Sequence, residues 1–223
     1  MFARICTLIA IFAMVLIWIG TSSAYKFYID AEEPSTPVKA PFELKKDKAD
    51  AFGGGYLVAP QGVGNDGDAI ATYKFPILTD GKYRFWGRVI AADGGNDSFF
   101  WGIDIPTADQ TSGENCDGEM PGNQKHIWDT TNPIASWGWS KMDSRNCAGT
   151  EGAEQLVVDL TAGDYTLYII QREDGTELDG ILITDQDLTP DQLPTTDAEA
   201  QALVSVEAKG KLATAWGAIK AQR

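Results

Sequence analysis

Short stretches of alternating apolar and polar residues recur along this chain, separated by Gly and Asp. In the clearest one, Lys82 to Ala92, the side chains of Tyr83, Phe85, Val89 and Ala91 fall on one face. Similar stretches are Ala69–Phe75, Ser98–Ile105, Glu154–Leu160, Tyr165–Gln171 and Leu178–Thr184. Because side chains of a strand point alternately to its two faces, this pattern predicts an all-β antiparallel β-sandwich. A jelly roll of two stacked sheets is the form we expect.

The segment from Pro106 to Thr150 differs from the rest. It is rich in Gly, Asp, Asn, Ser and Pro, and it is longer than an ordinary connection between strands. The tryptophans in it argue against disorder, because disordered segments are poor in aromatic residues. We therefore predict a long Trp-rich loop insertion on the sandwich.

The N-terminus has the features of a cleaved secretory signal. Arg4 precedes an apolar run from Ile5 to Ile19, and small residues from Thr21 to Ala24 end it. The run is shorter than the roughly 20 residues that a bilayer span needs. We expect residues 1–24 to be removed and the protein to be secreted, to an extracellular or periplasmic location. An uncleaved N-terminal anchor is the alternative.

The chain is strongly acidic, with 18 Lys and Arg against 32 Asp and Glu and a formal net charge of -14. Such a charge repels phosphate groups, so it disfavours nucleic acid and anionic membrane surfaces as partners. It fits a solvated extracellular protein, and one that holds calcium.

Beyond the leader only two cysteines remain, Cys116 and Cys147. An even number of cysteines in an exported chain favours a disulfide between them. Closing a loop of this length would stabilise the fold by about 3–4 kcal/mol. Two free thiols are the alternative.

The composition changes again after Asp187. Residues 189–196 read as a linker, and Asp197 to Val206 is predicted to be a short helix with Asp197 as its N-cap. We therefore expect a binding domain over residues 25–188, followed by a linker and a short helical C-terminal tail over 189–223. The tail would dock back on the sandwich or bind a protein partner.

Several phrases, taken in order, resemble a known family. They are Tyr28–Glu33, Gly54–Val58, Ala71–Phe75, Tyr83–Val89, Asn96–Phe99, Ala162–Leu167 and Arg172–Thr176. Over residues 25–188 their order resembles the carbohydrate-binding jelly rolls related to family 6 modules and the galactose-binding-like superfamily. Two features depart from that pattern: Asp30 replaces the usual opening Glu, and Pro106 to Thr150 does not align.

The resemblance implies a structural calcium ion between the first and last strands. Carried over by position, its ligands would be Asp30, Glu32 and Asp179. Calcium prefers six to eight hard oxygen ligands, and three acids brought together would repel one another without a cation. Alternatively, Asp30 and Asp179 are solvated edge charges or pair with Arg88 or Arg172.

The resemblance also implies a carbohydrate ligand, for which the Trp-rich segment offers candidates. Sugar sites combine aromatic planes for stacking with a few convergent polar groups. Trp137 and Trp139 share a face if their segment is extended, because they are two residues apart. The expected ligand-binding residues are Trp128, Trp137, Trp139, Asp129 and Asn132. Alternatively, some of these tryptophans cover the open end of the core.

Little in the sequence indicates catalysis. His126 is the only histidine, so a zinc site with several His ligands is excluded and a Ser-His-Asp triad would depend on it. The nearby acids Glu114, Asp117 and Glu119 are the other catalytic candidates. We therefore expect a secreted, non-catalytic carbohydrate-binding module, not an enzyme. The alternatives are a structural or adhesive surface protein that binds another protein, and a jelly-roll glycan lyase or hydrolase.

Overall fold

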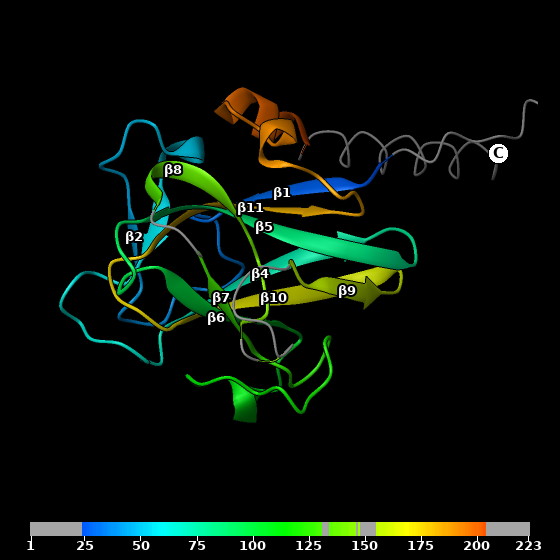
Figure 1. The fold of residues 1–223 in the computed structure, drawn as a ribbon, viewed down its shortest axis with the longest axis horizontal. Coiled ribbons are helices and arrows are strands. Elements are labelled where there is room, and N and C mark those ends of the chain that lie inside the picture. The colour runs from blue at the N-terminus through cyan, green and yellow to red at the C-terminus, as the bar shows by residue number, and fades with distance from the viewer. Residues whose placement is uncertain (1–23, 131–133, 146, 148–154, 204–223) are drawn as a thin grey trace, which may run out of the picture.

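The protein is described by a computed structural model over residues 24–130, 134–145, 147 and 155–203. Within these residues, two antiparallel sheets form a sandwich (Figure 1). The larger sheet contains β1 (Lys26–Asp30), β2 (Glu43–Lys45), β3 (Tyr56–Val58), β5 (Gly81–Ala91), β8 (Ile134–Lys141), β9 (Val157–Leu160) and β11 (Glu177–Thr184). The smaller contains β4 (Ile70–Ile77), β6 (Ser98–Ile103), β7 (His126–Asp129) and β10 (Gly163–Gln171). The predicted antiparallel β-sandwich is confirmed.

Strand pairing places β11 in the middle of the larger sheet. Its main path is β2-β3-β11-β5-β8, while β1 adds to β11 and β9 adds to β5. The smaller sheet has the order β4-β10-β6-β7. Short 3₁₀ turns flank the strands: η1 (Phe52–Gly54), η2 (Thr107–Asp109) and η3 (Pro190–Gln192). The first strand and the last strand of the sandwich are therefore neighbours, with Asp30 opposite Gly180.

The core between the sheets is aromatic. Phe85 and Trp101 face each other across it with ring centroids 5.5 Å apart. Phe99 and Trp128, neighbours on β6 and β7 of the smaller sheet, also have ring centroids 5.5 Å apart. Gly87 on β5 makes room for the Trp128 indole, because a Cβ at this position would overlap the ring. The alternation of Tyr83, Phe85 and Val89 predicted this inward face of β5 correctly.

The predicted loop insertion from Pro106 to Thr150 is wrong in part. It contains β7, which pairs with β6 on the smaller sheet, and β8, which pairs with β5 on the larger. Gly, Asp and Pro border both strands, so the composition of the whole segment concealed the β-forming residues of β7 and β8. The insertion thus extends both sheets, and it also includes η2 and irregular connections.

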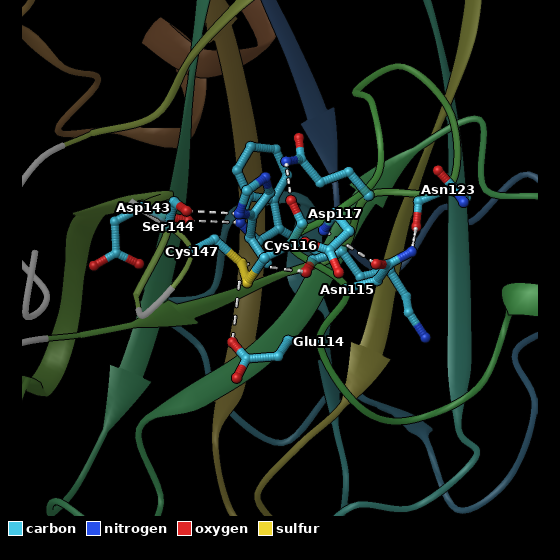
Figure 2. The surroundings of a disulfide bond; sticks show 12 residues. Glu114, Asn115, Cys116, Asp117, Asn123, Asp143, Ser144 and Cys147 are labelled. Atoms are coloured by element: carbon cyan, nitrogen blue, oxygen red, sulfur yellow. Dashed lines mark hydrogen bonds between the residues drawn. A yellow bond between two sulfur atoms is a disulfide. The ribbon is translucent and has the colours of Figure 1, made fainter. Parts of the chain in front are cut away.

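The predicted disulfide is present between Cys116 and Cys147, with 31 residues of sequence separation. Figure 2 shows the bridge with Glu114 beside Cys147 and Asn115 next to Asn123. Asn115 also exchanges backbone hydrogen bonds with Lys125, just before β7. The bridge therefore ties the loop that precedes β7 to the chain that follows β8.

The C-terminal segment folds back on the outer face of the larger sheet. Residues 197–203 are helical, and this orange segment lies next to β1 and β11 in Figure 1. Leu188, Leu193 and Ala200 are buried with Tyr28 and Leu182 of the sheet. The tail therefore docks on the sandwich as far as residue 203, and its buried apolar side chains lend no support to a protein partner there.

The predicted N-cap of this helix is wrong by one residue. The Thr196 hydroxyl accepts the Glu199 backbone N–H at 3.3 Å, and the Glu199 carboxylate accepts the Thr196 N–H at 3.3 Å. This reciprocal pair is a capping box, which makes Thr196 the N-cap. Asp197 is thereby free to accept a hydrogen bond from Gly53 instead.

No helix within the described residues has the length and apolar character needed to cross a membrane. The predicted signal, residues 1–24, lies outside the described residues except for Ala24, and so does the end of the predicted helix beyond residue 203.

Candidate functional site

Trp137 lies half-buried on β8, on the outer face of the larger sheet. Its indole packs edge-on against Tyr56, with ring centroids 5.6 Å apart. The Lys48 ammonium and the Arg88 guanidinium lie 5.5 and 5.4 Å from the ring centroid. The Trp137 Nε1 atom is buried without a hydrogen-bond partner. One partly accessible aromatic ring is thus flanked by Tyr56 and two cations, whose polar groups also pair with Asp47, Glu177 and Asp179.

Trp139 shares this face, as its two-residue spacing from Trp137 predicted. The Trp139 Nε1 donates a hydrogen bond to the Pro194 carbonyl at 2.8 Å, and its ring packs edge-on against Tyr28 with centroids 6.4 Å apart. The C-terminal segment therefore contacts Trp139, whereas Trp137 lies against Ala51, Tyr56 and the cations. Of the two indoles, Trp137 is the better placed to meet a ligand.

Trp128 is not available to a ligand. Its side chain is 0% exposed in the core, and its Nε1 donates to the Ser140 hydroxyl at 3.1 Å. The prediction that Trp128 stacks on a sugar is wrong, because β7 turns this residue inward against Phe99 and Gly87. The alternative expectation, that some of these tryptophans complete the core, holds for this residue.

Asp129 is also buried, and Asn132 lies outside the described residues. The Asp129 carboxylate forms an ion pair with Arg145, and its backbone N–H donates to Asp143 at 3.0 Å. Burial, together with the nearby charge of Asp129, raises the pKa of Asp143 to about 7. These contacts give Asp129 a structural role between the ends of β7 and β8.

A second pair of acids meets at the neighbouring strand ends. Burial and a hydrogen bond with Glu173 raise the pKa of Asp97 to about 7. Burial opposes ionisation of Glu173, but hydrogen bonds from the Asp97 N–H and the Ser98 hydroxyl lower its pKa. Arg172 pairs with Glu173 and also donates to Ser98. The pair and Arg172 therefore link the start of β6 to the chain just after β10.

The three predicted calcium ligands lie around one position at the β1–β11 edge. One oxygen of each, Asp30 Oδ1, Glu32 Oε2 and Asp179 Oδ1, is buried without a hydrogen-bond partner. Burial, with the neighbouring acids, raises the pKa of Glu32 to about 7. Burial also raises the pKa of Asp179 to about 6, against the opposing effect of Arg88. The acids therefore face one another in a poorly solvated place, where a cation would relieve their repulsion.

The Tyr28 hydroxyl and the Arg88 guanidinium also lie beside these carboxylates. The Tyr28 hydroxyl is buried there without a hydrogen-bond partner, and burial with the charges of Asp30 and Asp179 raises the pKa of Tyr28. Arg88 forms a buried ion pair with Asp179 through the other carboxylate oxygen. The alternative expectation that Asp179 pairs with Arg88 is thus confirmed, and it leaves Asp179 Oδ1 free.

The carboxylates of Asp30, Glu32 and Asp179 do not form a tight cluster. Among the described residues, the one group of three with ligand atoms all within 4.8 Å is Glu114, Cys116 and Cys147, whose sulfurs are joined as a disulfide. Oxygens on opposite sides of a calcium ion lie about 5 Å apart, so the carboxylates of Asp30, Glu32 and Asp179 would have to draw closer together to bind one ion.

Sequence reasoning missed several residues that surround Trp137 and the three carboxylates. Tyr56 is on the outward face of β3, so strand alternation carried that signal, whereas Arg88 was expected only as an ion-pair partner of Asp30 or Asp179. Lys48 lies in a loop and Gln201 in the C-terminal helix, where nothing in the pattern points to the sheet.

The only histidine is part of a buried pair. The Ser144 hydroxyl and His126 Nδ1 are 2.6 Å apart, and both residues are buried. Burial lowers the pKa of His126 to about 4. A general base must reach its substrate, so this pair is placed to join β7 to the chain after β8 and not to act on a ligand.

Comparison with known proteins gave no matching family model and no match among curated proteins. A family 35 carbohydrate-binding module from Clostridium thermocellum matches with a TM-score of 0.47 and 12% identity, over 72% of this chain and 98% of that one. A family 6 module from a Cellvibrio mixtus lichenase, in complex with cellotriose, matches with a TM-score of 0.42 and 18% identity, over 71% and 96%.

A β-(1,4)-mannanase from Podospora anserina that includes a family 35 module matches with a TM-score of 0.47 and 15% identity, over 74% of this chain. This chain spans only 29% of that enzyme. The solved structures that this chain is similar to thus include carbohydrate-binding modules of families 35 and 6.

Proposed function

We propose that this chain is an exported, non-catalytic glycan-binding module in which Trp137 stacks on a sugar ring. The observation that carries the proposal is the setting of Trp137: a half-buried indole with an unpartnered Nε1, flanked by Tyr56, Lys48 and Arg88. Sugars offer apolar C–H faces and hydroxyl groups, which such a combination of ring and donors matches. The acidic net charge suits an uncharged ligand better than a phosphorylated one.

The proposal includes a divalent cation, of the calcium class, at Asp30, Glu32 and Asp179. The unpartnered carboxylate oxygens support it, because an ionised group without a partner is costly to bury. The donor set is made of oxygens, as calcium prefers. Such a cation would hold β1 and β11 together near η1, on the outer face that carries Trp137.

A binding role is favoured over catalysis because the best acid–base candidates are inaccessible. His126 and Ser144 are both buried, and the raised pKa values of Asp97 and Asp143 belong to groups paired inside the fold. The acids Glu114, Asp117 and Glu119 lie on the loop that the disulfide ties to the chain after β8.

Affinity electrophoresis in gels containing different soluble polysaccharides tests the proposal. Wild-type protein should be retarded by at least one polysaccharide, and Trp137→Ala should migrate freely at an unchanged melting temperature. Tyr168→Ala is the matched control, because it removes a half-buried aromatic ring from the smaller sheet. Equal retardation of Trp137→Ala and wild type would show that the ligand binds elsewhere.

A further inference from the structure

The C-terminal strap, defined here as residues 188–203, reaches the carboxylates of the proposed cation site. The Gln201 Nε2 atom donates a hydrogen bond to Asp30 Oδ2 at 2.7 Å. Asp197 Oδ1 accepts the backbone N–H of Gly53 in η1 at 3.1 Å, and Gln201 also donates to Asp197 at 3.4 Å. One turn of helix thus contacts two sides of the site, β1 and η1.

Gly53 brings η1 directly against the carboxylates. Its φ of 64° lies in the left-handed region, and a Cβ there would overlap the Glu32 carboxylate. Any movement of η1 would therefore move the wall that encloses Glu32 and Asp30. Because Asp197 binds the Gly53 N–H, the strap helps to set the position of this wall.

In Asp30 and in Asp179, only one of the two carboxylate oxygens has a partner within the protein. Gln201 holds Asp30 Oδ2 and Arg88 holds an oxygen of Asp179, which leaves Asp30 Oδ1 and Asp179 Oδ1 unpartnered. Both of these oxygen atoms are buried, so neither is satisfied by bulk water. This division, with one oxygen fixed by the protein and the other free, is typical of carboxylates oriented for a metal by outer hydrogen bonds.

We propose that cation binding at Asp30, Glu32 and Asp179 and docking of the C-terminal strap are one linked equilibrium. Gln201 is a positioning residue, which orients Asp30 for the cation without binding the cation itself. The inference rests on the cation site of the proposed function. Because linkage is reciprocal, the cation strengthens docking of the strap by the same factor by which the strap strengthens cation binding.

The linkage also affects the outer face of the larger sheet, which carries Trp137 and Trp139. The strap also accepts the Trp139 Nε1 hydrogen bond through Pro194 and buries Leu193 against the sheet. Loss of the cation therefore favours release of Trp139, so the accessible aromatic surface beside Trp137 depends on the cation concentration.

Calcium titration of the metal-free full-length protein, followed by calorimetry, is the first test. Loss of an outer hydrogen bond to a metal ligand typically costs 10–100-fold in affinity, so Gln201→Ala should bind calcium about tenfold more weakly than wild type. Gln186→Ala, the same substitution just before the strap, should bind like wild type. Asp197→Asn should weaken binding, whereas Asp191→Asn, which removes the same charge from η3, should not.

Hydrogen exchange of residues 189–203 provides the second readout. Calcium should slow exchange of this segment in wild type and should do so much less in Gln201→Ala. Calcium binding of equal strength in wild type and Gln201→Ala, with exchange of the strap unaffected by calcium, would refute the linkage and leave the cation site standing. No calcium binding by folded wild type would refute the cation site, and the linkage with it.

Discussion

Replacing Trp128 separates a core role from a ligand-binding role. The side chain is fully buried, it packs against Phe99 with ring centroids 5.5 Å apart, and it donates to Ser140 at 3.1 Å. Trp128→Ala would leave a cavity between the sheets that Gly87, with no side chain, cannot fill. We therefore expect a large loss of stability and no specific effect on ligand affinity in the folded fraction.

The expected magnitude follows from the burial. Truncation of a buried Trp or Phe to Ala typically lowers the free energy of unfolding by about 3–5 kcal/mol. For a domain of this size that corresponds to a fall in melting temperature of roughly 6–20 °C. Trp137→Ala should cost clearly less, because Trp137 is only half-buried on the outer face.

Thermal and urea unfolding of both variants, followed by circular dichroism, would measure the difference. Wild-type protein treated in parallel gives the reference, and affinity electrophoresis reports on the ligand. If Trp128→Ala kept the wild-type melting temperature and lost glycan retention, the inward orientation of Trp128 and the reasoning from it would be refuted.

Three further predictions concern charges and the disulfide. Burial raises the pKa of Asp143 from 3.8 to about 7, so the folded state binds this proton more tightly than the unfolded state. The stabilisation by the protonated Asp143 is therefore full below about pH 4 and is lost as the pH rises towards 7. The melting temperature of Asp143→Asn should depend less on pH than that of wild type between pH 5 and 8, and an equal dependence would contradict the assignment. Arg88→Ala should cost about 3–5 kcal/mol in metal-free protein because it leaves Asp179 buried without a partner, whereas Arg84→Ala, whose partner is exposed, should cost under about 1 kcal/mol; equal losses would argue against the buried pair. Reduction of the disulfide should lower the free energy of unfolding by about 3–4 kcal/mol in urea titrations, and identical curves with and without reductant would contradict its presence.

Local patterns predicted the strands that carry strict alternation. The stretch Lys82–Ala92 corresponds to β5 at Gly81–Ala91, and Leu178–Thr184 to β11 at Glu177–Thr184. Both lie between turn residues that mark their ends, so their extent was recognisable although each strand contains a β-bulge. The disulfide was likewise predictable, because two cysteines beyond the predicted leader leave one pairing.

The strands within Pro106–Thr150 could not be recognised by composition. In β8 only Ile134 packs as an apolar residue against the core, while Gly138 and Ser140 are small, so the strand shows little of the apolar alternation that marks a strand. β7 is buried on both sides over His126–Asp129, and a short buried run has no period to detect. Trp128 was therefore assigned to a loop surface when pairing with β6 places it in the core.

The cation site was predicted by resemblance, but its surroundings depend on contacts far apart in sequence. Asp30 and Asp179 meet because β1 pairs with β11, as the family resemblance implied. Gln201 reaches Asp30 across a separation of 171 residues, and no local pattern encodes such a contact. The docking of the strap is a tertiary result of burying Leu193 and Ala200 against Tyr28 and Leu182.

Binding of the full-length protein to a broad glycan array, in calcium and in chelator, tests the central claim most directly. The account predicts retention on at least one class of poly- or oligosaccharide, loss of that retention in Trp137→Ala, and no loss in Tyr168→Ala. A folded wild-type protein that binds no glycan in calcium, or a Trp137→Ala variant that binds as wild type does, would contradict it.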